Sequence, residues 1–119
     1  GKDIEADFPA ILFGKGYDSC WVLDDYEKGV IKEDLVLAEP TSGRTLRVLS
    51  DQPGVQIYTG NWLSGCPMGK GGVRYDDYAG VAMECQNFPD APNKPHFSSA
   101  TLRKGERYEC HIVYEFGVE

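Results

Sequence analysis

The chain has 119 residues, which suits one domain, and 41% of them are hydrophobic, so it can hold a modest core. Nineteen Asp and Glu residues against twelve Lys and Arg give a net charge of −7, which argues against nucleic acid and anionic membrane surfaces, because both attract clustered basic residues. No apolar run approaches the roughly 18–20 residues that cross a bilayer. A neutral ligand such as a sugar, by contrast with nucleic acid, places no demand on the net charge of the protein.

Apolar and polar residues alternate with a period of two through much of the chain, which predicts β-strands. Fourteen glycines and seven prolines interrupt the chain, and no apolar stripe of helical period lasts three turns, so we expect few helices. The fold class predicted is all-β. In chain order, strands are expected at residues 20–24, 34–39, 44–50, 55–59, 80–85 and 107–118.

Two of these strand predictions carry further detail. Pro40-Thr-Ser-Gly43 joins strands 34–39 and 44–50 with residues typical of tight turns, so this pair is predicted to form a hairpin. In the last strand every second residue is apolar or aromatic, which predicts one buried face. The residues of that face are Tyr108, Cys110, Ile112, Tyr114, Phe116 and Val118.

The cysteines are dispersed, with no CxxC pair and no His at metal-ligand spacing, so no metal site is predicted. Two disulfides would be possible, but the chain lacks the dense cysteine framework of a small secreted scaffold and any Asn-x-Ser/Thr site. We therefore expect reduced thiols and a cytoplasmic location. The four cysteines are Cys20, Cys66, Cys85 and Cys110.

Two segments are more polar than core packing explains. Residues 51–61 place Gln56 and Asn61 around a predicted strand, and in residues 83–93 Glu84 ends a strand and leads into a proline-rich loop. Carboxylates and amides suit a sugar site, because each sugar hydroxyl both donates and accepts hydrogen bonds. A loop stiffened by proline also holds such groups in place at a small entropic cost on binding.

Pattern alone favours plainer interpretations of the same residues. By pattern, Glu84 and Gln56 would be surface residues and Asp18 a turn residue. Trp21 and Trp62 could stack on a sugar ring, but aromatic residues at strand positions are more often part of the core.

Taken together, however, the motifs resemble those of the aldose 1-epimerases, the galactose mutarotases. DQPGVQIYTGN at residues 51–61 is similar to their TQPGVQ-x-YTGN segment, and ECQNFPDAPN at residues 84–93 is similar to ETQ-x-(F/W)-PDAPN. GYDSCWVL at residues 16–23 resembles GYDHN-(F/Y)-VL, GKGG at residues 69–72 resembles a GK-G-G loop, and LRKGE at residues 102–106 resembles LRPGE. The order and spacing agree through essentially the whole chain.

The resemblance implies that residues 1–119 are the C-terminal part of a large antiparallel β-sandwich, the mutarotase supersandwich. It implies an isomerase that interconverts the α and β anomers of aldohexoses such as galactose or glucose, without metal or organic cofactor. Glu84 matches the general base, and Asp18 and Gln56 match residues that bind sugar hydroxyls. The resemblance makes Asn61 and Asn87 weaker candidates for substrate binding, with support of the loops as their other possible role.

Two departures from the family pattern matter. Ser19 and Cys20 stand where many members have His and Asn, which puts the sugar preference in doubt. No residue matches the family's acid histidine, since His96 and His111 align elsewhere. We therefore expect an N-terminal chain or segment of the same enzyme to supply the acid. The alternative is a non-catalytic carbohydrate-binding or structural β-module derived from the same fold.

Overall fold

The computed structural model describes residues 13–119, and these residues form an all-β structure, which confirms the predicted class. Among them, no helix is long and apolar enough to cross a bilayer. Three short 3-10 turns, η2 (Leu63–Gly65), η3 (Lys70–Gly72) and η4 (Ala91–Asn93), lie in the loops. The described strands are β1 (Asp18–Val22), β2 (Lys32–Glu39), β3 (Arg44–Ser50), β4 (Gly54–Tyr58), β5 (Ala82–Gln86) and β6 (Ile112–Val118).

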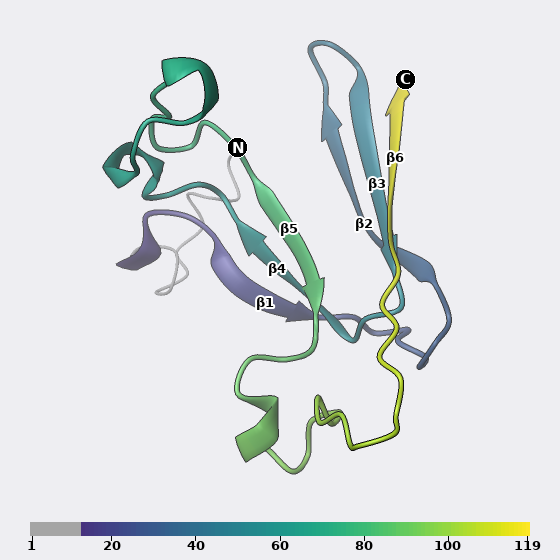
Figure 1. The fold of residues 1–119 in the computed structure, drawn as a ribbon. Coiled ribbons are helices and arrows are strands. Elements are labelled where there is room, and N and C mark those ends of the chain that lie inside the picture. Colours follow the sequence, from purple (N-terminus) through teal and green to yellow (C-terminus); the bar gives the residue numbers. More distant parts are fainter. Residues whose placement is uncertain (1–12) are drawn as a thin grey trace. The chain divides into compact units, whose positions relative to one another are not determined.

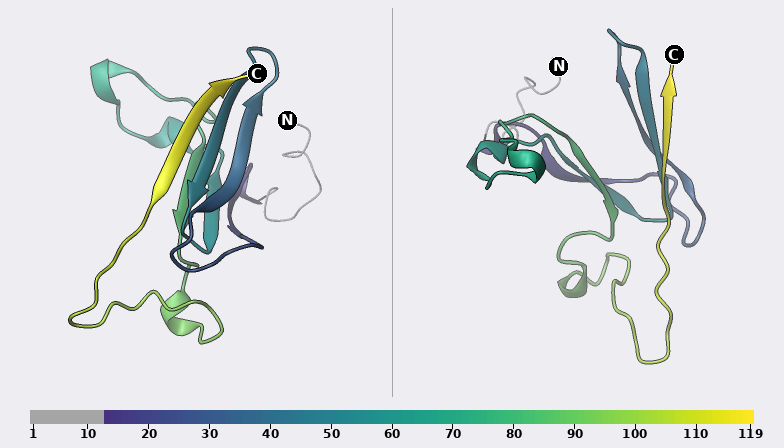
Figure 2. Two further views of the ribbon diagram at one scale, coloured as in Figure 1. Left: turned by 90° about the vertical axis from the view of Figure 1, so that its right-hand side faces the viewer. Right: turned by 45° about the horizontal axis from the view of Figure 1, so that its top comes forward.

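The strands form two three-stranded sheets, ordered β1-β4-β5 and β2-β3-β6 (Figures 1 and 2). The chain also divides into two compact units. Of the described residues, one unit contains 13–21 together with Gln56–Glu84, and the other contains Val22–Val55 and Cys85–Glu119. The β2-β3-β6 sheet lies wholly within the second unit, and we describe each sheet by itself.

The hairpin between β2 and β3 is confirmed, and the side chain of Glu39 closes it. The two carboxylate oxygens of Glu39 accept hydrogen bonds from the backbone N–H groups of Thr41 (2.8 Å) and Ser42 (2.7 Å). Hydrogen bonds from Ser42 and then Thr41 lower the pKa of Glu39 to about 2. Gly43 ends the turn with φ of +69°, a conformation that glycine adopts without strain.

In the β2-β3-β6 sheet, most of the large apolar side chains share one face. Its central strand β3 pairs antiparallel with both neighbours, and the register aligns Leu37 with Leu46 and Leu46 with Phe116. Side chains directly opposite one another in antiparallel strands point to the same face. We call this side the apolar face; its apolar and aromatic residues are Leu35, Leu37, Leu46, Val48, Ile112, Tyr114, Phe116 and Val118, and Glu39, Arg44 and Ser50 lie on the same side.

The other face of the same sheet carries an ion-pair network centred on Arg47. One guanidinium nitrogen of Arg47 lies 2.5 Å from a carboxylate oxygen of Glu33, and another lies 3.0 Å from a carboxylate oxygen of Glu115. All three side chains are 43–50% exposed, so solvent screens these ion pairs and each contributes little to stability. Val36, Leu49 and Val113 lie on this face as well, so it carries both charged and apolar side chains.

The prediction for the last strand was wrong in two respects. β6 begins at Ile112 rather than at residue 107, because its partner β3 ends at Ser50, which pairs with Ile112. The predicted alternation does place Tyr114, Phe116 and Val118 on one face, but that face is not buried, since Phe116 is 80% and Val118 76% exposed.

Few apolar residues are buried in the described part of the chain. Val48 is fully buried, and Val55, Cys85 and Ala91 are at most 7% exposed. Trp21 and Trp62, expected in the core, are each 52% exposed, so that expectation was wrong. None of the four cysteines is in a disulfide bond.

Candidate functional site

Asp18 and Gln56 are brought together by the pairing of β1 with β4. The backbone N–H of Thr59 donates to the carbonyl oxygen of Tyr17 (3.1 Å), which sets the register of the adjacent antiparallel strands β1 and β4. In this register Asp18 lies diagonally across from Gln56, two residues from the position directly opposite it. Diagonal neighbours of this kind can touch. The Gln56 amide nitrogen donates to one carboxylate oxygen of Asp18 at 2.7 Å. Asp18 therefore opens a strand instead of forming a turn, and Gln56 lies on the central strand of its sheet.

Glu84 lies on β5, the strand next to β4. Successive side chains of a strand point to opposite faces. Val55 and Cys85 are buried, whereas Gln56 is half-buried and Glu84 exposed, so we infer that Gln56 and Glu84 share the more open face of the sheet. Asp18, Gln56 and Glu84 thus occupy three neighbouring strands (Figure 1). Within residues 13–119 the side chain of Glu84 is exposed, as pattern alone indicated.

Asn61 has another role in the described residues. It is fully buried, and its amide nitrogen donates to the carbonyl oxygen of Tyr17 at 3.0 Å. Its amide oxygen accepts a 2.5 Å hydrogen bond from the Thr59 hydroxyl, whose oxygen in turn accepts from the Tyr17 N–H at 2.9 Å. These contacts favour loop support over direct sugar contact, because they fix the residue that precedes Asp18.

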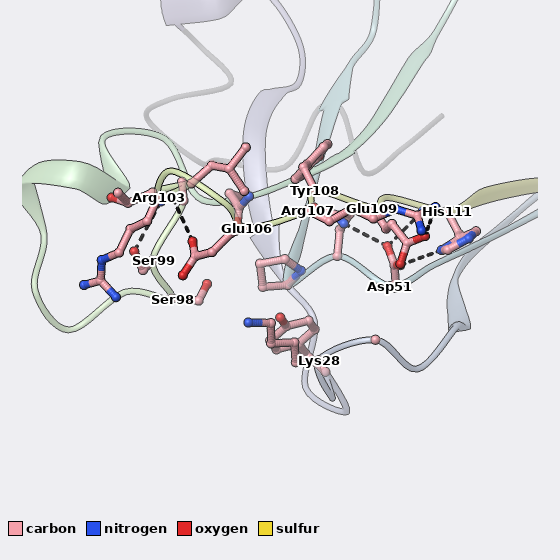
Figure 3. A pocket seen from close by; sticks show the side chains of 18 residues that line it. Lys28, Asp51, Ser98, Ser99, Arg103, Glu106, Arg107, Tyr108, Glu109 and His111 are labelled. Atoms are coloured by element: carbon pink, nitrogen blue, oxygen red, sulfur yellow. Dashed lines mark hydrogen bonds and ion pairs between the residues drawn. The ribbon is translucent and has the colours of Figure 1, made fainter.

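Asn87 lies elsewhere, at a cavity of about 790 Å³ within the second unit (Figure 3). The cavity lies between the segment after β3, around Asp51, and the loop that leads into β6, which contributes Arg103, Glu106 and His111 (Figure 3). Its lining contains Asn87 but none of the other four candidate residues. In the described residues, Asn87 thus lies in the loop after β5 and lines this cavity.

The sequence model of the family described as aldose 1-epimerase matches residues 1–115. The chain belongs to the aldose 1-epimerase family. Galactose mutarotase of Bos taurus is 47% identical over 77 residues, which cover 65% of this chain and 22% of that protein. Aldose 1-epimerase of Haemophilus influenzae is 36% identical over 104 residues, 86% of this chain and 29% of that protein. The chain thus spans less than a third of the length of these relatives.

Beyond the family motifs, sequence reasoning missed a pairing between Asp51 and His111. One Asp51 oxygen accepts from the His111 backbone N–H (3.0 Å) and the Gln52 amide (2.8 Å), and the other lies 2.9 Å from His111 Nδ1 (Figure 3). Burial raises the pKa of Asp51, but the bonds from His111 and Gln52 outweigh it and lower the pKa to about 2. Asp51 stands where the aldose 1-epimerase motif has threonine, which is the one sign of this pairing in the sequence. Its partner His111 lies 60 residues away, so the sequence did not indicate it.

We predict that this pair stabilises the second unit in a pH-dependent way. The folded-state pKa of Asp51 lies below its ordinary value of 3.8, so the stabilisation is complete above about pH 4 and is lost as the pH falls from about 4 to 2. The free energy of unfolding should fall by about 1 kcal/mol over this range, after allowance for solvent screening. Urea unfolding at a series of pH values measures this. Asp51→Asn should flatten the dependence across that window, and Asp24→Asn, at an exposed site, should leave it intact.

Neither histidine of the described residues is in a metal-ligand or catalytic cluster. The ring of His111 contacts Asp51, and the ring of His96 packs edge-on against Phe97 at 4.5 Å between centroids. Across residues 13–119 no group of three or more His, Cys, Asp or Glu side chains could hold a metal ion.

Proposed function

We propose that this chain contributes the general base and part of the sugar-binding surface of an aldose 1-epimerase acting on aldohexoses such as galactose or glucose. The observation that carries the proposal is the hydrogen bond between Gln56 on β4 and Asp18 on β1, in the sheet where Glu84 lies on β5, the other neighbour of β4. These are the residues that match the family's sugar-binding and base positions. The relatives named galactose mutarotase and aldose 1-epimerase support the same activity.

In this proposal Glu84 removes the proton from the C1 hydroxyl while an acid protonates the ring oxygen. The ring opens, the C1–C2 bond rotates, and closure delivers the other anomer. Gln56 donates one N–H to Asp18, which leaves the Gln56 carbonyl oxygen and the second Asp18 oxygen able to accept from sugar hydroxyls. Their mutual hydrogen bond holds both groups before the sugar binds, which lowers the ordering cost of binding.

The acid is proposed to come from an N-terminal chain or segment of the same enzyme. His111 contacts Asp51 and His96 packs on Phe97, and neither matches the family's acid. The exposed Glu84 would gain the partial burial that favours a catalytic carboxylate only when such a segment covers it. We propose the cytoplasm as the compartment and no cofactor for the reaction.

The alternative is a non-catalytic carbohydrate-binding module. The Asp18–Gln56 hydrogen bond would serve sugar binding without any acid, and the exposure of Glu84 in the described residues is compatible with that interpretation. Retention of the base together with its proline-rich loop favours the enzyme.

Binding by Asp18 is the first test. We define the completed assembly as the full chain mixed with the N-terminal portion of bovine galactose mutarotase, up to the start of the stretch that matches this chain. Asp18→Asn should weaken galactose binding to this assembly by about 10–100-fold, since a hydrogen bond to a charged group contributes about 1.5–3 kcal/mol. Calorimetric titration measures it. Asp76→Asn, at an exposed carboxylate of the same unit, is the matched control, and equal affinities for the two variants would remove Asp18 from the sugar site.

A further inference from the structure

Tyr78 joins the two loops that flank the Asp18–Gln56 pair. Its hydroxyl donates to the carbonyl oxygen of Lys15 at 2.6 Å, and its backbone N–H donates to the carbonyl oxygen of Gly60 at 2.8 Å. Lys15 precedes β1 and Gly60 follows β4. Tyr78 therefore holds the chain where it enters the strand of Asp18 and where it leaves the strand of Gln56. All five residues belong to the same compact unit.

Both partners in the Tyr78–Lys15 hydrogen bond have an unfavourable backbone conformation. Lys15 has φ of +58° and Tyr78 φ of +65°, values at which the Cβ of a residue other than glycine is crowded. Such conformations persist where surrounding contacts hold them, and they are frequent at binding and catalytic sites. Among residues 13–119, Asp90 is the third residue other than glycine with a positive φ. Two of the three thus meet in one hydrogen bond beside β1.

The side chain of Lys15 is held as well as its backbone. Its ammonium nitrogen lies 4.1 Å from the centroid of the Trp62 ring, which is a cation–π contact. Hydrogen bonds from Ser64 lower the pKa of Asp77, and the charge of Lys15 lowers it further. Because Asp77 directly precedes Tyr78, the contacts of Lys15 all lead to the same two loops.

The contacts of Tyr78 converge on the backbone of Tyr17. On one side, the Gly60 carbonyl that accepts from Tyr78 lies between the two residues whose side chains hydrogen-bond to Tyr17. On the other side, Lys15 lies two residues before Tyr17 in the chain. Because Tyr17 directly precedes Asp18, a shift at either contact would be passed to the Asp18 carboxylate.

We propose that Tyr78 is a positioning residue of the sugar site, which fixes the Asp18 carboxylate in place to accept from the Gln56 amide and from a sugar hydroxyl. This inference rests on the proposed function. Tyr78 is 54% exposed, and its bond to Lys15 lies at the surface, so water can satisfy the Lys15 carbonyl once the hydroxyl is removed. The bond therefore contributes little to stability, and its effect is on geometry.

The first arm of the test uses the chain alone. The NMR signals of the Gln56 side-chain amide report its hydrogen bond to Asp18. Tyr78→Phe, which removes the hydroxyl alone, should move these signals in the same direction as Asp18→Asn and leave the thermal unfolding temperature unchanged. A general loss of stability would not move the signals of the folded state. Tyr75→Phe, at another exposed tyrosine of the same unit, is the matched control and should leave the signals in place.

Tyr78→Asn is the second test variant should Tyr78→Phe fail to fold. Asparagine tolerates a positive φ better than other residues with a side chain, and its side chain is too short to replace the phenol hydroxyl. The expected movement of the Gln56 signals is the same.

The second arm is galactose titration of the completed assembly. Tyr78→Phe should weaken binding by about 2–10-fold, the usual effect of one hydrogen bond. In the Asp18→Asn background it should cause no further loss, because both changes act on one carboxylate and their effects are then not additive. A full further loss in that background would show that Tyr78 acts independently of Asp18 and would overturn the assignment.

The two arms separate this inference from the proposed function. Gln56 signals that stay unchanged in Tyr78→Phe would overturn the positioning role, whatever the activity of the assembly. Failure of the wild-type assembly to bind galactose would instead remove the proposed function, and the NMR result on the chain alone would still decide whether Tyr78 positions Asp18.

Discussion

Replacing Glu84 with Gln is expected to slow the interconversion of galactose anomers by the completed assembly by about 10²–10⁴-fold, the usual contribution of general acid–base catalysis. The amide keeps the size of the side chain and its capacity to accept a hydrogen bond, but it cannot take the proton of the C1 hydroxyl. Galactose affinity should change little, because the Gln56–Asp18 pair does not include Glu84. Exchange spectroscopy by NMR gives the rate directly from the two anomeric signals.

The control is Asp76→Asn, which removes an exposed carboxylate from the same unit and should retain the wild-type rate. Since Glu84 is exposed in the described residues, its replacement should leave the thermal unfolding temperature of the chain unchanged. A full rate in Glu84→Gln would refute its assignment as the base, whatever the fate of the fold.

Gly16→Ala is expected to cause the largest loss of stability, about 2–5 kcal/mol, since it combines backbone strain with overpacking. Gly16 has φ of +152°, and an added Cβ would lie 2.5 Å from the Thr59 hydroxyl oxygen and closer still to the Asn61 amide oxygen. The Thr59 hydroxyl accepts from the Tyr17 N–H and the Asn61 amide nitrogen donates to the Tyr17 carbonyl oxygen, so relief of the clash would also displace Asp18. Chemical unfolding gives the stability, and galactose titration of the completed assembly gives the effect on binding.

Gly29→Ala separates strain from overpacking. Gly29 also has a positive φ, +78°, but an added Cβ would meet no atom of the described residues within 4 Å, so its replacement should cost only about 1 kcal/mol and leave sugar binding alone. Equal losses of stability in the two variants would contradict the role assigned to the packing of Thr59 and Asn61 against Gly16.

The strands could be predicted well from local pattern, but whether another part of the protein buries a given strand face could not. Residues 44–50 were predicted as a strand with the bounds of β3, because alternation and the Pro40–Gly43 turn agree there. Alternation shows which side chains share a face, but whether a face is covered depends on chain that is distant or outside the sequence. The exposure of Phe116 and Trp21 could therefore not be foreseen.

The candidate site, too, could be predicted only in part. Asp18, Gln56 and Glu84 were identified through family motifs, whereas pattern alone assigns Gln56 and Glu84 to the surface and Asp18 to a turn. The structure adds the Asp18–Gln56 bond, which depends on the pairing of strands 38 residues apart. The Asp51–His111 bond joins residues 60 apart. No local rule predicts such contacts, because they arise from strand register and loop closure rather than from neighbouring residues.

The most direct test of the central proposal is the optical rotation of freshly dissolved α-galactose in the presence of the completed assembly. We predict that rotation approaches equilibrium much faster than in buffer, that the acceleration scales with the concentration of the complex, and that Glu84→Gln abolishes most of it. A complex that forms and binds galactose, yet leaves the rotation changing at the rate seen in buffer, would contradict the proposal and favour a carbohydrate-binding module.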